Sequence, residues 1–344
     1  MLYARRPRPV SDRPRGSLPQ GVRSGWRLGW RRAIFVALWV CLLGATTQAP
    51  SASAAFPGRD GLIATDDSDG ACTGSCADAG GPGNTVSTVN PRSRRVSRVT
   101  SGSLDAQAFA PRWSPTGKLL VFVQFAFPMD SQVLAVSDPT GGELKVIPLP
   151  SGLGAPSDPA FTADGAHLLF VDRDVRGYDV FRVALDGSGL TRVTNLVAPS
   201  ALATPVESSG GRIVFDRGGS IYLLDRAGHP KRLHAGSRPD FSPRGARIVF
   251  EEPSRRLIET IGINGHGLRP MTRIPPADVC GRDRGAGPVY SPSGKFIAFT
   301  RSGNCGQPPD ALIVIHANGT HPRVVLKGDP VQDPNWQPIP RSAG

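Results

Sequence analysis

The sequence predicts an all-β protein, a six-bladed β-propeller, and three observations support this prediction. A unit with the pattern Pro-x-aromatic recurs along the chain at spacings of 34 to 49 residues, which is the range of a four-stranded propeller blade. Short apolar runs follow tight turns, and no helical periodicity of useful length appears after residue 60. The two ends of the chain each supply part of one further blade. A β-sandwich with a coincidental period is the alternative.

Residues 1–54 are predicted to be an export leader, a signal peptide with cleavage near Ala54/Ala55. They hold nine arginines and one acid, and the apolar run Ala33–Ala45 is followed by the small residues Ala52-Ser53-Ala54. An uncleaved membrane anchor is the alternative, although the run is short for a bilayer. We therefore expect a protein that is secreted or held in the cell envelope, with membrane contact only through the leader.

The charge of the chain lies mostly in this leader. The formal net charge is +12, and without residues 1–54 the remaining 31 basic and 27 acidic residues leave +4. A nucleic-acid partner is not predicted, because its electrostatic footprint would rest on residues absent from the mature protein.

Each predicted blade opens with an inner strand that carries the Pro-x-aromatic unit. The clear copies are Pro111–Trp113, Pro159–Phe161, Pro239–Phe241, Pro288–Tyr290 and Pro334–Trp336, and Pro205–Glu207 is a degenerate copy. Tight turns follow, as in Ser114–Gly117, Ser242–Gly245 and Ser291–Gly294. Ser in the first position, Pro in the second and Gly in the fourth favour a type I turn.

The next strands of each blade are predicted from apolar runs and hairpin turns. The central runs are about four residues long and typical of strands buried on both faces: Leu119–Phe122, Leu168–Phe170, Ile213–Phe215, Ile248–Phe250 and Phe296–Phe299. Asx-Gly turns then lead to the outer strands at Asp186–Gly189, Asn264–Gly267 and Asn318–Thr320.

One strand from each end of the chain is predicted to close the ring. Gly61–Thr65, Asn84–Val89 and Arg95–Thr100 supply three strands of the first blade, and Asp333–Trp336 supplies its missing inner strand. Their pairing buries two otherwise exposed strand edges. The propeller is expected to span residues 55–338, with a short tail at 339–344.

These repeats resemble those of the TolB-type six-bladed β-propeller, a relative of WD-type repeat proteins. The resemblance is carried by WSPTGKLLVF at Trp113–Phe122, ALDGSGLTRVT at Ala184–Thr194 and HANGTHPRVVL at His316–Leu326, and it covers about residues 56–338. It implies the propeller fold and a protein or peptide partner. Nothing matches the separate N-terminal α/β domain of TolB, so its role in the Tol envelope system is not carried over. The fourth unit departs from the pattern, with Glu207 at the aromatic position.

The binding face is predicted to lie opposite the tight turns, where the loops are longer. These loops are 66–83, 124–132, 172–179, 251–256, 273–287 and 301–310. At the mouth of the central channel on this face, the predicted binding residues are Arg112, Asp158, Arg238, Asp240 and Asp333, whose charges suit a charged ligand or a chain terminus. The alternative is that the Asp-Pro pairs only shape the entry of the strand.

The four cysteines that follow the leader also fall on this face. Cys72, Cys76, Cys280 and Cys305 are predicted to form disulfides, since an even number in an exported protein favours them. The pairs Cys72–Cys76 and Cys280–Cys305 are the simplest scheme, cross-pairing is the alternative, and a four-thiolate zinc site fits the C-x3-C spacing poorly.

No cofactor is predicted, with calcium as the one weak candidate. Asp66, Asp67 and Asp69 offer oxygen ligands of the kind that calcium prefers. Their spacing is irregular, so a solvated acidic loop is the favoured interpretation.

The search for catalytic motifs is mostly negative. The chain has no G-x-S-x-G, H-E-x-x-H or G-x-x-x-x-G-K-[ST] pattern, and its six histidines are scattered. We predict a monomeric, non-catalytic scaffold that binds a protein or peptide in the envelope. The alternatives are a glycan-active enzyme, a lyase or hydrolase, and a propeller that binds cell-wall carbohydrate through Phe125, Phe127 and Tyr178.

Overall fold

The structure is a computed structural model that describes residues 56–67, 84–101, 106–126, 131–174, 176–196, 202–225, 227–273, 287–301, 311–327 and 331–341. The chain divides into two units, 1–47 and 48–344, and all described residues belong to the second. Within these ranges every regular element is a strand, and none is a helix that could cross a membrane. The leader and the four cysteines lie outside the described residues.

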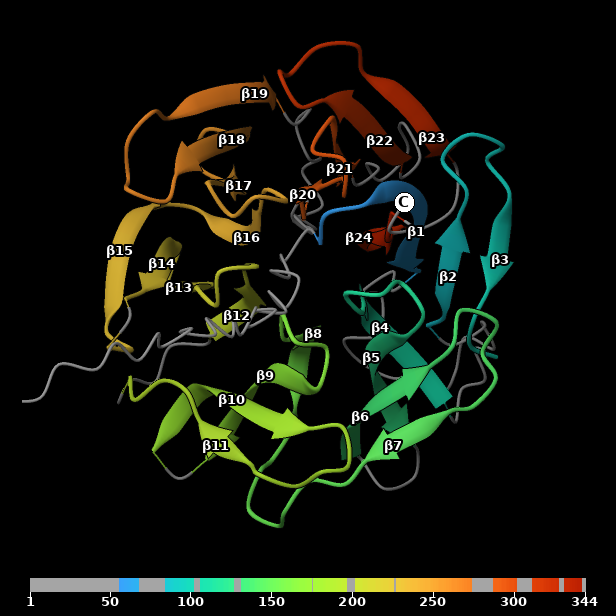
Figure 1. The fold of residues 1–344 in the computed structure, drawn as a ribbon, viewed down its shortest axis with the longest axis vertical. Helices are drawn as coiled ribbons and strands as arrows, with labels where there is room; N and C mark the ends of the chain where they lie inside the picture. The colour runs from blue at the N-terminus through green and yellow to red at the C-terminus, as the bar shows by residue number, and fades with distance from the viewer. Residues whose placement is uncertain are drawn as a thin grey trace, which may run out of the picture. The chain divides into compact units, whose positions relative to one another are not determined.

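Six four-stranded antiparallel sheets form the blades of a propeller around a central axis (Figure 1). Five blades consist of consecutive strands. Blade II holds β4 (Ala106–Trp113), β5 (Leu120–Ala126), β6 (Ser131–Ser137) and β7 (Lys145–Ile147), and blade III holds β8 (Ser157–Phe161), β9 (His167–Asp174), β10 (Gly177–Ala184) and β11 (Thr191–Arg192). Blade IV holds β12 (Leu202–Glu207), β13 (Ile213–Arg217), β14 (Ser220–Leu224) and β15 (Pro230–Ala235), and blade V holds β16 (Ser237–Phe241), β17 (Arg247–Glu252), β18 (Leu257–Gly262) and β19 (Arg269–Arg273). Blade VI holds β20 (Val289–Tyr290), β21 (Phe296–Arg301), β22 (Ala311–His316) and β23 (Arg323–Lys327).

Blade I closes the ring with strands from both ends of the described chain, as predicted. It holds β1 (Arg59–Asp66), β2 (Val86–Val89), β3 (Val96–Arg98) and, as its inner strand, β24 (Gln332–Ile339). β24 pairs antiparallel with β1, with Trp336 opposite Ile63. The buried Trp336 also stacks on Phe296 of blade VI at 6.3 Å between ring centroids. This strand therefore joins two blades as well as completing one.

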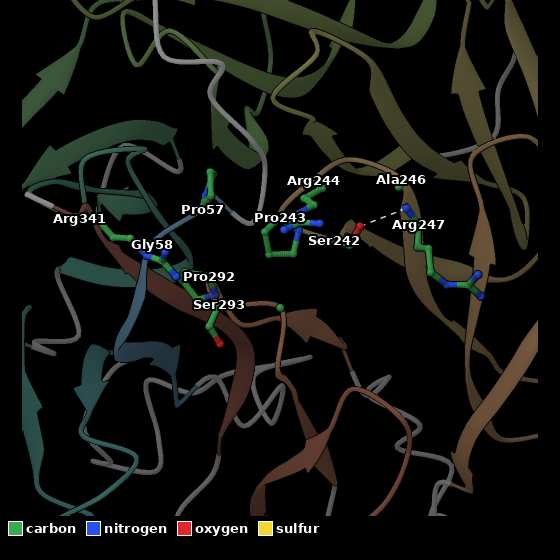
Figure 2. A pocket seen from close by; sticks show the side chains of 11 residues that line it. Pro57, Gly58, Ser242, Pro243, Arg244, Ala246, Arg247, Pro292, Ser293 and Arg341 are labelled. Atoms are coloured by element: carbon green, nitrogen blue, oxygen red, sulfur yellow. Dashed lines mark hydrogen bonds between the residues drawn. The ribbon is translucent and has the colours of Figure 1, made fainter. Parts of the chain in front are cut away.

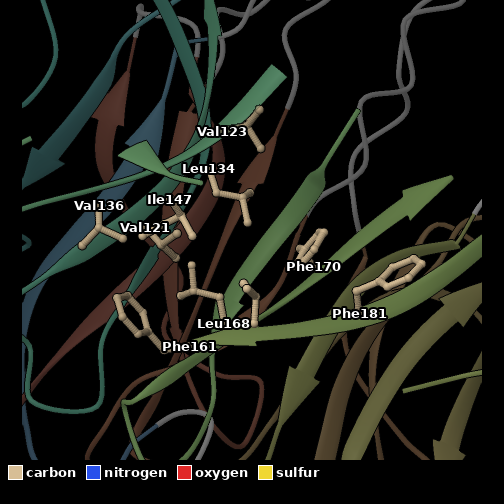
Figure 3. Packing of buried hydrophobic residues seen from close by; sticks show 10 residues of the cluster. Val121, Val123, Leu134, Val136, Ile147, Phe161, Leu168, Phe170 and Phe181 are labelled. Atoms are coloured by element: carbon tan, nitrogen blue, oxygen red, sulfur yellow. The ribbon is translucent and has the colours of Figure 1, made fainter. Parts of the chain in front are cut away.

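The core consists of apolar layers between neighbouring blades. Between blades II and III, side chains such as Val121 and Leu134 meet Phe161, Leu168 and Phe170 (Figure 3). Both faces of each central strand are covered, which explains why these strands read as continuous apolar runs instead of alternating ones. The six-bladed all-β prediction is confirmed.

The predicted type I turns also form. Gly117 donates its backbone N–H to the carbonyl of Ser114 at 2.9 Å, and Gly117 has a φ of +66°, which favours glycine there. The departure in blade IV is accommodated, because Glu207 accepts a hydrogen bond from the backbone of Ala163 in blade III at 3.0 Å. A carboxylate thus replaces the aromatic ring at this blade contact.

Two of the predicted long loops are mostly strand, and a third, 251–256, is shortened at its start. In blade III, β9 and β10 pair as far as Asp174 and Gly177, with Asp172 opposite Asp179, so that 172–179 is a hairpin. The segment 124–132 is likewise shortened by β5 and β6, and 251–256 by β17. The apolar runs underestimated these strands because backbone pairing continues through polar residues at the rim of a blade.

Candidate functional site

The inner strands share an unusual backbone feature where they enter the channel. In all six blades the residue before the inner-strand proline has a left-handed backbone, with φ between +43° and +55°: Ala110, Asp158, Thr204, Arg238, Gly287 and Asp333. We call these six residues the bulge ring. The register of β4, β8, β12, β16 and β24 shifts at this point. A residue before proline normally prefers an extended backbone, and such strain is concentrated at functional sites.

Small and charged residues alternate around the bulge ring. Ala110, Thr204 and Gly287 belong to blades II, IV and VI, whereas the charged members belong to blades III, V and I. Nη1 of Arg238 donates to Oδ1 of Asp333 at 2.5 Å, although blade VI separates their blades. A Cβ atom on Gly287 would lie 3.7 Å from this Nη1, at ordinary van der Waals contact, so the ion pair passes directly in front of this residue.

Three further carboxyl groups lie around the same guanidinium. Burial, followed by the charge of Asp333, raises the pKa of Asp158 above its ordinary value, while Arg238 opposes this shift. Asp216 accepts hydrogen bonds from Oγ1 of Thr204 at 2.5 Å and from the backbone of Arg238 at 3.3 Å. Burial raises the pKa of Asp216 to about 6. The channel mouth therefore gathers four carboxyl groups around the guanidinium of Arg238, those of Asp333, Glu251, Asp158 and Asp216.

The structure places Asp240 and Arg112, the other predicted mouth residues, further along the inner strands. Oδ2 of Asp240 accepts a hydrogen bond from the backbone of Tyr290 in the next blade at 2.9 Å, and burial raises its pKa to about 7. Oδ1 of Asn335 likewise accepts a hydrogen bond from the backbone N–H of Trp113 at 2.7 Å. Asp240 therefore ties two blades together.

A phenylalanine fills the channel at this deeper level. The buried side chain of Phe56 lies among inner-strand residues of five blades, including Ala160, Val206 and Asn335. The space left over is about 20 Å³, which is enough for about one water molecule. The channel mouth is therefore closed below, on the side of the tight turns.

The calcium candidates that are described have protein partners. Oδ2 of Asp66 accepts a hydrogen bond from the backbone of Ala110 at 2.7 Å, and Asp67 accepts one from Oγ1 of Thr85 at 2.6 Å. Asp69 lies outside the described residues. Within the described ranges, no three His, Cys, Asp or Glu side chains are grouped to hold a metal ion. Calcium stays the weak alternative to the expectation of no cofactor.

Two of the three aromatic candidates for carbohydrate binding lie among the described residues, and both are half-buried. The guanidinium of Arg173 lies over the ring of Tyr178, 5.7 Å from its centroid. This contact leaves one face of the half-buried ring covered. Phe125 is also half-buried, and Phe127 lies outside the described residues.

The sequence did not point to a cavity on the tight-turn face (Figure 2). This cavity of about 590 Å³ lies between the turns of blades V and VI and the two ends of blade I. Arg244 and Arg341 lie at its sides, while Arg247 points away and donates to the carbonyls of Thr260 and Gly267. The sequence predicted only tight turns on this face, and it placed the binding site on the opposite face.

Comparison with solved structures decides the type of propeller. The chain is similar to TolB from Acinetobacter baumannii, with a TM-score of 0.63 and 21% identity over 81% of this chain and 67% of that chain. It is similar to a TolB structure from Agrobacterium tumefaciens, with a TM-score of 0.55 and 17% identity over 79% and 91%. The described chain has the fold of a TolB-type six-bladed propeller.

The TolB-type propeller is also similar to a chain in a nidogen/laminin complex, with a TM-score of 0.59 and 9% identity over 82% of this chain and 100% of that one. No family model and no curated protein sequence matches the chain. At these identities the likeness shows the fold and leaves the ligand to be inferred from the channel mouth.

Proposed function

We propose that this protein is an exported binding scaffold that engages a protein or peptide partner in the cell envelope through the channel mouth. The observation that carries the proposal is the charge of the bulge ring. Four carboxyl groups lie around the guanidinium of Arg238, those of Asp158, Asp216, Glu251 and Asp333, and Arg112 also acts on Asp158. A further cation, such as a lysine or arginine side chain or a terminal ammonium group, would balance this excess of carboxyl groups with charge-assisted hydrogen bonds.

The shape of the channel favours a side chain over a larger ligand. Phe56 leaves about 20 Å³ below the bulge ring. A single side chain or chain terminus of the partner therefore enters the channel mouth, and the other residues of the partner contact the rim. The likeness to TolB and to a chain of a nidogen/laminin complex is consistent with a binding role for this fold. Location in the envelope rests on the predicted leader and on the likeness to TolB.

The proposal predicts that binding strengthens as the pH rises. The pKa of Asp216 is about 6, so this carboxyl group gains charge between pH 5 and pH 8, and the pKa of Asp158 is also raised, by burial and by the charge of Asp333. Ionised carboxylates attract a cation and protonated ones do not, so the dissociation constant for a cationic partner should fall over this range.

The test is a pull-down from cell-envelope extract with the mature protein, beginning at Ala55, and the variant Asp158→Asn/Asp216→Asn/Asp333→Asn. The wild type should capture a defined protein, and the variant should lose at least about tenfold of it. The matched control is Asp138→Asn/Asp186→Asn/Asp225→Asn, three turn residues of which Asp138 is half-buried and the other two are exposed. Asparagine already occupies equivalent turn positions at Asn264 and Asn318, so this control should fold and bind normally.

Two outcomes contradict the proposal. Equal capture by the wild type and the channel-mouth variant would place the binding surface elsewhere. Retention or cleavage of wall glycan without any captured protein would replace the scaffold with the carbohydrate-binding or enzymatic alternative.

A further inference from the structure

One side of the propeller rim carries positive charge that the channel mouth does not use. The outer strands β3 and β23 are neighbours at the rim (Figure 1). The turn before β3 and β3 itself carry Arg92, Arg94, Arg95 and Arg98, and β23 carries Arg323 and Lys327. All six side chains are exposed. The described ranges 84–101 and 311–327 contain no Asp or Glu, and none of the six forms an ion pair with a described carboxylate.

Hydrogen bonds order the turn that carries these arginines and the side chain of Arg323. Oδ1 of Asn90 accepts hydrogen bonds from the backbone of Arg92 at 2.9 Å and of Ser93 at 3.0 Å. Nη1 of Arg323 donates to the carbonyl of Pro91 at 2.6 Å and so joins the tip of blade I to blade VI. A cationic surface that is ordered before binding loses less conformational entropy when a ligand arrives.

A groove runs along β23 between these charges. It has a volume of about 480 Å³ and is lined by Arg94, Arg323, Val324, Val325, Leu326 and Lys327. Arg323 and Lys327 stand four residues apart on one strand, which is about 13 Å. Val324 is 38% exposed and Leu326 is half-buried, so aliphatic surface lies between the cations. Cations at both ends of a groove suit an extended chain better than a single small anion.

We propose that this groove binds a linear phosphodiester chain without bases, of the poly(glycerol phosphate) kind. Guanidinium groups bind phosphate oxygens in a bidentate manner, and the short carbon segments between phosphates match Val324 and Leu326. Sugars and nucleobases prefer aromatic rings, and none of the six lining residues is aromatic. The groove is separate from the channel mouth, and the inference does not depend on the proposed function.

The test measures binding of the mature protein to a purified poly(glycerol phosphate) chain at several salt concentrations. Binding should weaken with salt, because each phosphate contact releases condensed counterions. The variant Arg94→Glu/Lys327→Glu should bind at least about tenfold more weakly, with the log–log salt slope reduced by about 1.4 for two lost contacts. The control Arg269→Glu/Lys231→Glu makes the same charge change on exposed residues of β19 and β15 and should bind like the wild type.

Three comparison probes make the proposal falsifiable: polygalacturonate, oligodeoxythymidylate and phosphatidylglycerol vesicles. Each should bind at least about tenfold more weakly than the phosphodiester chain at equal charge concentration. Preference for the vesicles would assign the surface to a membrane, and preference for either other polymer would assign it to a uronate glycan or to nucleic acid. If both double variants weakened binding of the phosphodiester chain equally, binding would depend on the net charge of the protein and not on this groove. Any of these results overturns the proposal.

Discussion

A chain that ends after Lys327, and so lacks β24, is expected to lose the cooperative folding of the propeller. The truncation removes the inner strand of blade I and the buried Trp336, and it exposes the edge of β1 as well as the side of blade VI at Phe296. A ring that is open at one blade presents unpaired strand edges, which promote aggregation. The measurement is thermal unfolding followed by circular dichroism, together with the oligomeric state in solution.

Two further variants separate closure from general damage at the C-terminus. A chain that ends after Arg341 keeps β24 complete and should unfold at the wild-type temperature. Trp336→Ala keeps the strand but removes a buried ring, at an expected loss of about 3–5 kcal/mol in the free energy of unfolding. If the chain that ends after Lys327 unfolded at the wild-type temperature, the ring would not need β24.

The second large effect is expected from Asp240→Asn, which should stabilise the protein at pH 8. Burial raises the pKa of Asp240 from 3.8 to about 7, and at about 1.4 kcal/mol per pKa unit this corresponds to roughly 4 kcal/mol of stability lost on ionisation. Asparagine keeps the acceptor for the backbone of Tyr290, as Asn335 does for Trp113 in blade I. The variant therefore removes the buried charge and retains the hydrogen bond.

The direction of the pH dependence follows from the raised pKa. Between about pH 4 and pH 7 the folded protein binds a proton at Asp240 that the unfolded chain has released. The free energy of unfolding should therefore fall as the pH rises through this range, and Asp240→Asn should flatten that part of the curve. Urea unfolding at pH 5 and pH 8 measures both effects. Asp225→Asn, at an exposed turn, is the control. Destabilisation of Asp240→Asn at pH 8 would show that the carboxylate charge is needed, for example beside Arg112.

The blade pattern was predictable because its signals are local. A proline and an aromatic ring mark five of the six inner strands, and Ser-Pro-x-Gly marks three of the turns that follow, as Ser114–Gly117 shows. Strand ends were less predictable. The pairing of Asp172 with Asp179 depends on a backbone hairpin that no apolar pattern marks. The cysteine pairing and the leader stay predictions, since both lie outside the described residues.

The predicted mouth residues divided into two groups. Asp158, Arg238 and Asp333 precede prolines in the inner strands, and each has a left-handed backbone at the bulge ring. Asp240 and Arg112 follow such prolines and lie deeper, among the side chains around Phe56. The charge pattern selected both groups, but it carries no information on depth along the channel. Asp216, from a central strand, was missed because its position after Phe215 has the appearance of a strand end.

The sequence by itself determined the number of blades, the order of their strands and the closure of the ring. Each of these follows from turn chemistry, from apolar runs and from the complementary fragments at the two ends. Only the tertiary structure decided that Arg238 of blade V meets Asp333 of blade I, 95 residues away, in front of Gly287. It also decided that Phe56 closes the channel below them. These contacts depend on the left-handed residue before each inner-strand proline and on the closure of the ring, which brings together side chains from blades that are far apart in the sequence.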